Sequence, residues 1–310
     1  MKSFTAGKNE EGVRLLRFCE KVCPTMPKSM LHKAFRNKRV KINGKKQSAD
    51  YKLVPGDLIE LYINDEFFSE KESPVKTADY SKLNILYEDA NVLIVVKPFG
   101  LLCHSDNKNE DNLIDMVISY LIDKGEYSPV KDTSFTPALC NRIDQGTEGI
   151  VIAAKNHPAL ADINEAIRNN STEKIYICIT SYSVKDGIYK AYLKRDKTAK
   201  KVTVTERNIP DSKEIITGFR TIESKGNHNL VECTLYTGRT HQIRAHLAFI
   251  GSSILGDRKY GKPFPETESQ LLCAYKLRFG LLDEKLSVAY LSGKEFCYEN
   301  NHVKKFFDKL

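Results

Sequence analysis

The stretch LYTGRTHQIRAHL, residues 235–247, does most to decide which fold this chain adopts. Its apolar beginning favours a strand, and Gly238 then allows the backbone to turn. Thr240 is a suitable N-cap for a helix that we expect over residues 241–250. The stretch therefore predicts a strand, a tight turn and a short helix in immediate succession.

The start of this predicted helix is suited to binding an anion. Backbone amides at a helix N-terminus can bind a phosphate, and Arg239 adds positive charge there. His241 and Arg244 lie three residues apart and share a face of the helix. His241 and His246 lie five residues apart and share no face, which argues against a zinc site.

Two other segments carry candidate catalytic groups. Residues 141–149, NRIDQGTEG, place Arg142 and Asp144 on a polar loop directly before an apolar strand. Loops on a rigid sheet often carry catalytic groups, although a simple surface turn explains the same residues. Tyr176 lies within KIYICI, residues 174–179, and taken alone is most simply a core tyrosine.

Short apolar runs dominate the rest of the chain, and many follow one another without a helix between them. This order favours an α+β fold with a large mixed, mostly antiparallel sheet over a doubly wound parallel sheet. Helices are expected over residues 113–122 and 158–168, the second capped by Asn156. Strands are expected over residues 92–96, 150–154, 175–180, 202–205, 215–222, 230–236 and 271–279.

Positive charge is concentrated at the start of the chain. Residues 1–62 contain 14 Lys or Arg residues and 6 Asp or Glu residues, so they carry the whole formal net charge of +8. Such a concentration indicates a module that binds a polyanion, although a solvated basic face on an ordinary domain has the same composition.

The same region is similar to a known RNA-binding motif. Two short helices are followed by short strands, and Asn43-Gly44 is a strong tight-turn signal. This pattern resembles the alpha-L motif of a small-subunit ribosomal protein and of several RNA-modifying enzymes. The resemblance rests on residues 29–35, 39–45 and 54–59.

That resemblance implies a division of the chain into a small and a large domain. We expect a small α/β RNA-binding domain over residues 12–65, a linker over 66–82 and the larger domain over 83–300. The cations of the small domain expected to contact RNA phosphates are Arg39, Lys41, Lys45 and Lys46.

The three segments of the larger domain match, in order and spacing, the RluA-like family of pseudouridine synthases, the large-ribosomal-subunit type. Its third motif is Thr-Gly-Arg-Thr-His-Gln-Ile-Arg, then a helix, a Pro-Ile-Leu-Gly-Asp-like turn and Tyr-Gly. It is almost complete here in residues 237–244 and 254–261. The resemblance implies that Asp144 is the catalytic aspartate, that Tyr176 stacks on the uracil, and that Arg244 pairs with the aspartate. It further implies that Arg142 enters the space left by the flipped base and that Arg239 and His241 contact the RNA.

Three positions depart from the family pattern. Asn141 stands where the first motif usually has His, Glu148 stands for the usual Ser, and Cys273 replaces a frequent His. None of these changes removes a proposed catalytic group, but the first two alter the loop that carries Asp144.

We therefore expect an enzyme that isomerises specific uridines of structured RNA by base flipping, with an aspartate nucleophile. Large-subunit ribosomal RNA is the expected substrate, and transfer RNA is the alternative. The reaction transfers no group and oxidises nothing, so no cofactor and no metal is expected. A non-catalytic RNA-binding protein remains an alternative, as does a glycoside-cleaving hydrolase with Glu148 as second carboxylate. Scattered cysteines and the lack of a long apolar run favour the cytoplasm, outside any membrane. A monomer is expected, although no sequence feature decides the oligomeric state.

Overall fold

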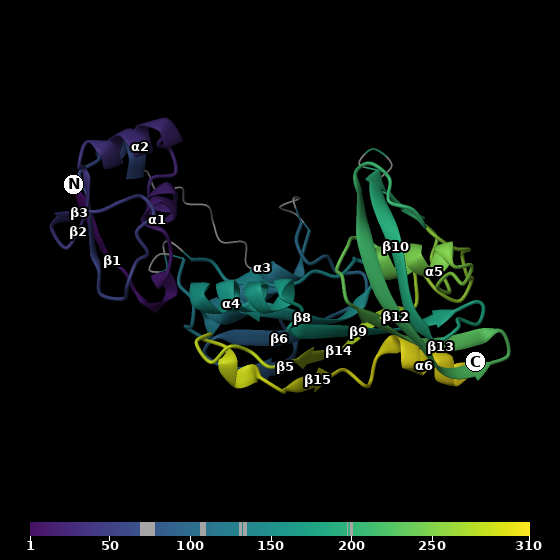
Figure 1. The fold of residues 1–310 in the computed structure, drawn as a ribbon. Helices are drawn as coiled ribbons and strands as arrows, with labels where there is room; N and C mark the ends of the chain where they lie inside the picture. The colour runs from purple at the N-terminus through teal and green to yellow at the C-terminus, as the bar shows by residue number, and fades with distance from the viewer. Residues whose placement is uncertain (69–77, 106–109, 130–131, 133–134, 197, 199–200) are drawn as a thin grey trace.

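The computed structural model describes residues 1–68, 78–105, 110–129, 132, 135–196, 198 and 201–310, which form two units (Figure 1). The N-terminal unit, residues 1–68, has its own sheet and its own buried core. The C-terminal unit, residues 78–310, contains the large sheet. The predicted linker over 66–82 falls largely on residues 69–77, which lie outside the described residues.

The N-terminal unit packs two helices on a four-stranded sheet of order β1-β4-β2-β3. Asn43 and Gly44 both adopt positive φ, at 51° and 75°, as the predicted tight turn between β2 and β3 requires. The unit also extends past both ends of the predicted domain, because strand β1 precedes residue 12 and Phe68 is buried in the core. Its elements are β1 (Lys2–Thr5), a 3-10 turn (Lys8–Glu10), α1 (Leu15–Val22), α2 (Lys28–Arg36), β2 (Val40–Ile42), β3 (Lys45–Lys46), β4 (Leu58–Leu61) and a 3-10 turn (Asp65–Phe68).

The large sheet of the C-terminal unit is mixed and mostly antiparallel, as predicted. Its central order is β11-β10-β12-β13-β9-β14-β8-β6-β5, with β15 paired to β14 and β7 to β8. Among the described residues every neighbouring pair is antiparallel except β14 and β8. The strands are β5 (Asn84–Glu88), β6 (Val92–Lys97), β7 (Ala138–Leu139), β8 (Glu148–Ala154), β9 (Thr172–Thr180), β10 (Gly187–Asp196), β11 (Lys201–Thr205), β12 (Ser212–Lys225), β13 (His228–Leu235), β14 (Leu272–Phe279) and β15 (Glu295–Cys297).

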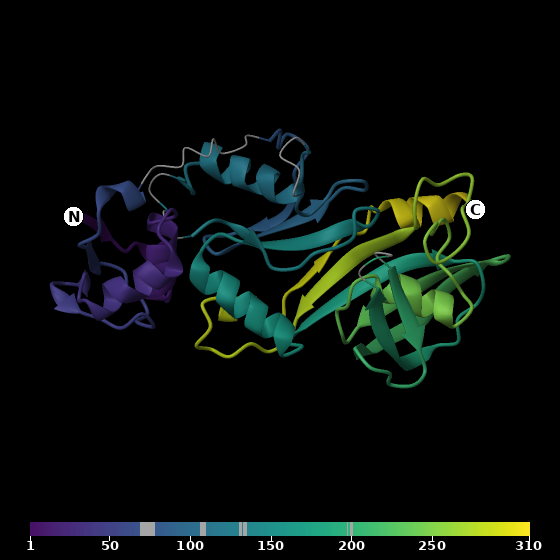
Figure 2. The same ribbon diagram turned by 90° about the horizontal axis from the view of Figure 1, so that it is seen from above.

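Helices cover both faces of this sheet. The helices are α3 (Leu113–Asp123), α4 (His157–Arg168), α5 (Gln242–Phe249) and α6 (His302–Lys309), with a 3-10 turn at Ala289–Leu291. Figure 2 shows α3 and α4 on opposite sides of the sheet. The Asn156 side chain accepts a hydrogen bond from the Ala159 amide, so the predicted cap of α4 is confirmed. Within the described residues, none of the helices combines the length and apolar character needed to cross a bilayer.

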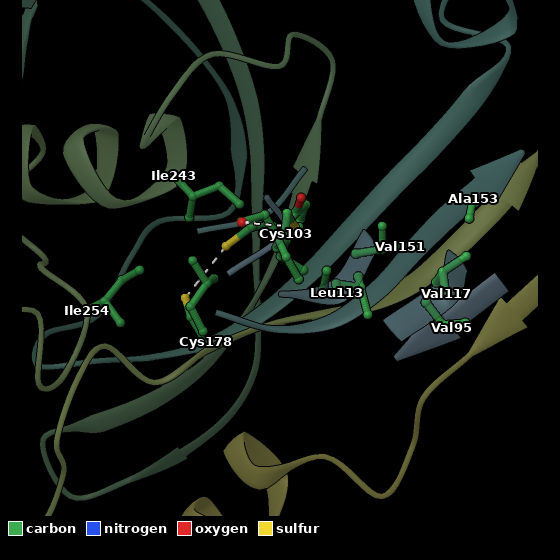
Figure 3. Close-up of a cluster of buried hydrophobic side chains, with 14 of the residues drawn as sticks. Val95, Cys103, Leu113, Val117, Val151, Ala153, Cys178, Ile243 and Ile254 are labelled. Atoms are coloured by element: carbon green, nitrogen blue, oxygen red, sulfur yellow. Dashed lines mark hydrogen bonds between the residues drawn. The ribbon is translucent and has the colours of Figure 1, made fainter. Parts of the chain in front are cut away.

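Successive side chains of a strand point to opposite faces of the sheet, so the core forms one layer on each face. On β6, Leu93 and Val95 pack with α3, whereas Val92 and Ile94 pack with α4 on the other face. Figure 3 shows part of the cluster that contains Leu93 and Val95, and the Ile243 side chain of α5 faces this same cluster. Helices α3 and α5 thus lie on one face of the sheet, where α5 is held against the strands that carry the candidate residues.

Helix α6 lies past the expected end of the larger domain at residue 300. Asn301 caps it through a hydrogen bond from the Lys304 amide, and Val303 and Phe307 are buried against strand β9. Because these two apolar side chains are separated by one helical turn, they form a stripe that requires the sheet for burial. The helix therefore belongs to the C-terminal unit.

The two units meet through a few polar contacts around α4. The Asn9 amide donates to Asp132 Oδ1 at 2.7 Å, and Lys21 Nζ donates to Thr136 Oγ1 at 3.0 Å. His157 Nδ1 lies 3.2 Å from the Glu11 carbonyl oxygen. These contacts place the N-terminal unit at the end of the sheet that carries α4 (Figure 1).

Candidate active site

Three segments that are distant in the sequence line one cavity of about 490 Å³ in the C-terminal unit. The loop between β7 and β8 contributes Asp144, strand β9 contributes Tyr176, and helix α5 contributes Arg244. The sequence-predicted residues Arg142, Arg239 and His241 line the same cavity. The fold therefore brings together every residue predicted for the catalytic centre.

Arg244 connects two carboxylates. Its Nε and Nη2 donate to Asp257 Oδ2 and Oδ1 at 2.7 and 2.9 Å, and its Nη1 donates to Asp144 Oδ2 at 2.9 Å. Burial opposes the charge of Arg244, but the hydrogen bonds and charges of Asp257 and Asp144 outweigh it and raise its pKa. Asp144 Oδ1 accepts no hydrogen bond from the described residues, so one carboxylate oxygen is left for a ligand.

Asp257 anchors this arrangement from within the protein. Its side chain is fully buried, and it also accepts hydrogen bonds from the backbone amides of Lys259 and Tyr260. Burial alone would raise the pKa of Asp257, but these bonds and the Arg244 charge lower it. The bidentate pair fixes the plane of the guanidinium, so its third nitrogen is directed at Asp144.

Tyr260 orders the other side of Asp144. Its ring lies 5.3 Å from the Arg244 guanidinium, and its hydroxyl accepts a hydrogen bond from the Val202 amide. The hydroxyl also forms a 2.8 Å hydrogen bond with His241 Nδ1. His241 Nε2 lies 3.8 Å from Asp144 Oδ2. Burial lowers the pKa of His241, which favours the neutral imidazole.

Tyr176 forms an aromatic part of the cavity wall. Strand β9 alternates, so Ile175 and Ile177 face the cluster beneath α6 while Tyr176 faces the cluster beneath α5. Burial, followed by the negative charge of Asp144, raises the pKa of Tyr176. The side chain therefore remains a neutral phenol at physiological pH, and an aromatic face is what it offers a ligand.

The start of helix α5 differs from the prediction. Thr240 is not the cap: His241 occupies the N-cap position with φ 54°, and no side-chain cap bond is present. Gln242 organises the turn instead, because its Oε1 accepts hydrogen bonds from the Arg239 amide and Thr237 Oγ1. Its Nε2 donates to the Ile216 carbonyl oxygen, which fastens the turn to strand β12.

Lys97 supports the loop that carries Asp144, a role that was not predicted from the sequence. Its side chain is fully buried at the end of β6, and Nζ donates to the carbonyl oxygens of Pro98, Leu101 and Gln145. Burial lowers the pKa of Lys97 to about 8. The signal was a lysine directly after five apolar residues, because a lysine buried with them is costly unless its ammonium is hydrogen-bonded.

The three unusual positions have structural partners. Asn141 Oδ1 accepts a hydrogen bond from the Ile152 amide, and Cys273 is buried opposite Glu148 in the β14–β8 pair. Glu148 Oε2 accepts bonds from the backbone and ring nitrogens of His302 at 3.0 and 2.5 Å. Burial would raise the pKa of Glu148, but these bonds lower it. An ionised carboxylate that does not line the cavity is unsuited to be a general acid, which argues against a hydrolase.

The cations predicted for the N-terminal unit do not line the cavity. Arg39, Lys45 and Lys46 are exposed, and Lys41 Nζ lies 4.9 Å from the centre of the exposed Tyr62 ring. They gather around strands β2 and β3, at the end of the molecule away from α5 (Figure 1). Within the described ranges, no cluster of three or more His, Cys, Asp or Glu side chains could hold a metal ion.

Known proteins resemble this chain over most of its length. Residues 91–249 match the model of a family described as RNA pseudouridylate synthase. An uncharacterized RNA pseudouridine synthase of Mycoplasma capricolum is 33% identical over 303 residues, which cover 95% of this chain and 96% of the relative. A ribosomal large subunit pseudouridine synthase C of Rickettsia bellii is 29% identical, with 80% of this chain and 82% of the relative covered.

A solved structure has a similar fold. Human RNA pseudouridylate synthase domain containing 4 superposes with a TM-score of 0.55 at 20% sequence identity. The match covers 71% of this chain and 89% of that chain.

Proposed function

The chain belongs to the RNA pseudouridylate synthase family and is an RNA pseudouridine synthase, and we propose that Asp144 acts on the sugar of its target uridine. The observation that carries the proposal is the unequal use of the two carboxylate oxygens. Oδ2 is held by Arg244, whereas Oδ1 accepts no hydrogen bond from the described residues. Such a group has a fixed direction and a free oxygen with which to attack the anomeric carbon.

The proposed reaction proceeds in the cavity without any added group. Asp144 Oδ1 bonds to the anomeric carbon as the bond from that carbon to uracil N1 breaks, and the freed uracil turns. Ring carbon 5 then bonds to the anomeric carbon as the bond to Oδ1 breaks. The proton on carbon 5 is then lost and N1 gains one. Arg244, bound to both Asp144 and Asp257, keeps the carboxylate aligned during these steps.

The target base is reached by base flipping. A uridine within structured RNA is stacked, so it must leave the stack to reach a half-enclosed cavity. The neutral ring of Tyr176 would stack on the flipped uracil, and the exposed Arg142 on the cavity rim would occupy the position that the base left. The basic residues around β2 and β3 would bind phosphates further along the RNA.

We propose large-subunit ribosomal RNA as the substrate, with transfer RNA as the alternative. The name of the Rickettsia bellii relative, ribosomal large subunit pseudouridine synthase C, supports this choice, as does a separate basic unit that would contact an extended RNA.

The test is to map pseudouridines by carbodiimide-stop sequencing in cells that lack the protein and carry one of three versions. Wild type should restore a site in large-subunit ribosomal RNA, and Asp144→Asn should restore none. The control is Asp211→Asn, an exposed loop aspartate with φ 64°, a conformation that Asn also adopts. Restoration by Asp144→Asn would refute the role of Asp144, and a restored site in transfer RNA would refute the proposed substrate.

A further inference from the structure

The cavity contains more positive charge than its acidic residue can balance. Asp144 is the acidic side chain among the described residues that line it, and Arg244 already pairs with that carboxylate. Three further cations line the cavity, namely Arg142, Lys174 and Arg239. Their side chains make no hydrogen bond or ion pair with the part of the chain that the structure describes.

Lys174 differs from the two arginines because it is partly buried. Arg142 and Arg239 are exposed, so water solvates their charges, whereas burial lowers the pKa of Lys174. An ammonium group without a partner in a partly buried position costs folding free energy. Such a charge calls for a ligand that compensates it when the cavity is filled.

The backbone places Lys174 beside the turn that precedes α5. Lys174 pairs with Leu235 in the β9–β13 register, and it lies two residues before Tyr176 on the same face of the strand. A Cβ on Gly238 would lie 3.7 Å from Lys174 Nζ. The ammonium therefore lies next to a residue without a side chain, and the exposed Arg239 follows directly.

We propose that Lys174, together with Arg239, binds a phosphodiester group next to the flipped uridine. The proposal rests on the proposed function, in which Tyr176 holds the base and Asp144 meets the sugar of the same nucleotide. Lys174 and Tyr176 lie on one face of β9, so a nucleotide stacked on the tyrosine carries its own phosphate along that face. A phosphodiester supplies the negative charge that this end of the cavity lacks.

The test measures tritium released from total RNA that is labelled with [5-³H]uridine and isolated from cells lacking the protein. Lys174→Met should raise KM about tenfold, the effect of losing one charge-assisted hydrogen bond, while kcat changes by less than about twofold. A plot of log(kcat/KM) against log salt concentration should lose about one unit of slope. Lys174→Arg should keep both values near those of wild type, and Lys174→Gln provides a second neutral side chain.

The matched control is Lys276→Met, which removes a lysine of β14 that pairs with Glu295 and does not line the cavity. It should leave KM and the salt slope unchanged. A Lys174→Met enzyme with the wild-type KM and slope would overturn the inference, as would a Lys174→Arg enzyme as impaired as Lys174→Met. A wild-type enzyme whose tritium release equals that of Asp144→Asn would instead refute the role of Asp144, and this inference with it.

Discussion

The cavity around Asp144 and the basic face of the N-terminal unit, formed by Arg39, Lys41, Lys45 and Lys46, differ in how their charged side chains are solvated and paired. Arg244 is nearly buried and contacts two carboxylates, whereas Arg39, Lys45 and Lys46 are exposed to solvent. A buried charge that loses its partner is strongly destabilising, while a solvated surface charge contributes little to stability. Basic side chains therefore hold the Asp144 carboxylate in place in the cavity, whereas on the basic face they are expected to provide salt-dependent affinity for RNA.

The largest effect is expected at the Arg244–Asp257 pair. Arg244→Met leaves the fully buried Asp257 without its partner, so the free energy of unfolding should fall by about 3–5 kcal/mol. Pseudouridine formation should also be lost. Urea unfolding and tritium release measure the two effects.

A double variant separates stability from catalysis at this pair. Arg244→Met/Asp257→Asn removes both buried charges and keeps an acceptor for the Lys259 and Tyr260 amides, so it should regain most of the lost stability, but no activity. Unchanged stability of Arg244→Met alone would show that Asp257 does not depend on Arg244.

A smaller effect on the free energy of unfolding is expected from lowering the pH, and it should arise from a buried histidine of the C-terminal unit and not from an exposed one of the N-terminal unit. Burial lowers the pKa of His246 on α5 to about 4, whereas His32 of the N-terminal unit is exposed. Between pH 4 and the ordinary value of about 6.5, the unfolded chain binds more protons than the folded one. The contribution of neutral His246 to the free energy of unfolding is therefore fully present above pH 6.5. It decreases as the pH falls, and about 2 kcal/mol of it is lost at pH 5.

Urea unfolding at pH 7 and pH 5 measures this effect. His246→Gln should lose this part of the pH dependence, and His32→Gln should retain it. Equal pH dependence in wild type and His246→Gln would contradict the assignment to His246.

The smallest effect on the fold is expected at the basic face. Lys45→Ala/Lys46→Ala should change the free energy of unfolding by no more than about 0.5 kcal/mol. The variant should bind RNA several-fold more weakly and lose about two units of salt slope, with kcat unchanged. Filter binding over a range of salt concentrations tests this, and an unchanged slope would remove the basic face from the RNA-binding surface.

Local patterns predicted most of the large sheet because its strands are continuous apolar runs. Strands β6, β8 and β9 have both faces covered, so their sequences contain few polar residues. Strand β10 was missed because much of it is exposed and it carries two lysines and an arginine. Helix α6 was missed because its two buried side chains form a stripe too short to recognise without the sheet beneath it.

The resemblance of the motif segments to a known family predicted that Asp144, Tyr176 and Arg244 share one site, and all three line the cavity, but the residues that support them were not predicted. Lys97, Tyr260 and Asp257 matter through contacts that only the folded chain creates. The prediction that Thr240 caps α5 was wrong for a related reason. The side chain that organises this turn is Gln242, which donates a hydrogen bond to the distant strand β12. Hydrogen bonds between segments far apart in sequence leave no periodic signal.

The bond between Glu148 and His302 also has a consequence for how the enzyme is made. The two residues are 154 positions apart, and Glu148, the first residue of β8, follows Asp144 by four residues at the end of the loop. While a ribosome synthesises the chain, the loop emerges long before the segment that fastens its end. The restraint on that loop can form only late in translation, so a nascent chain that stalls before residue 302 contains Asp144 but lacks this anchor of its loop.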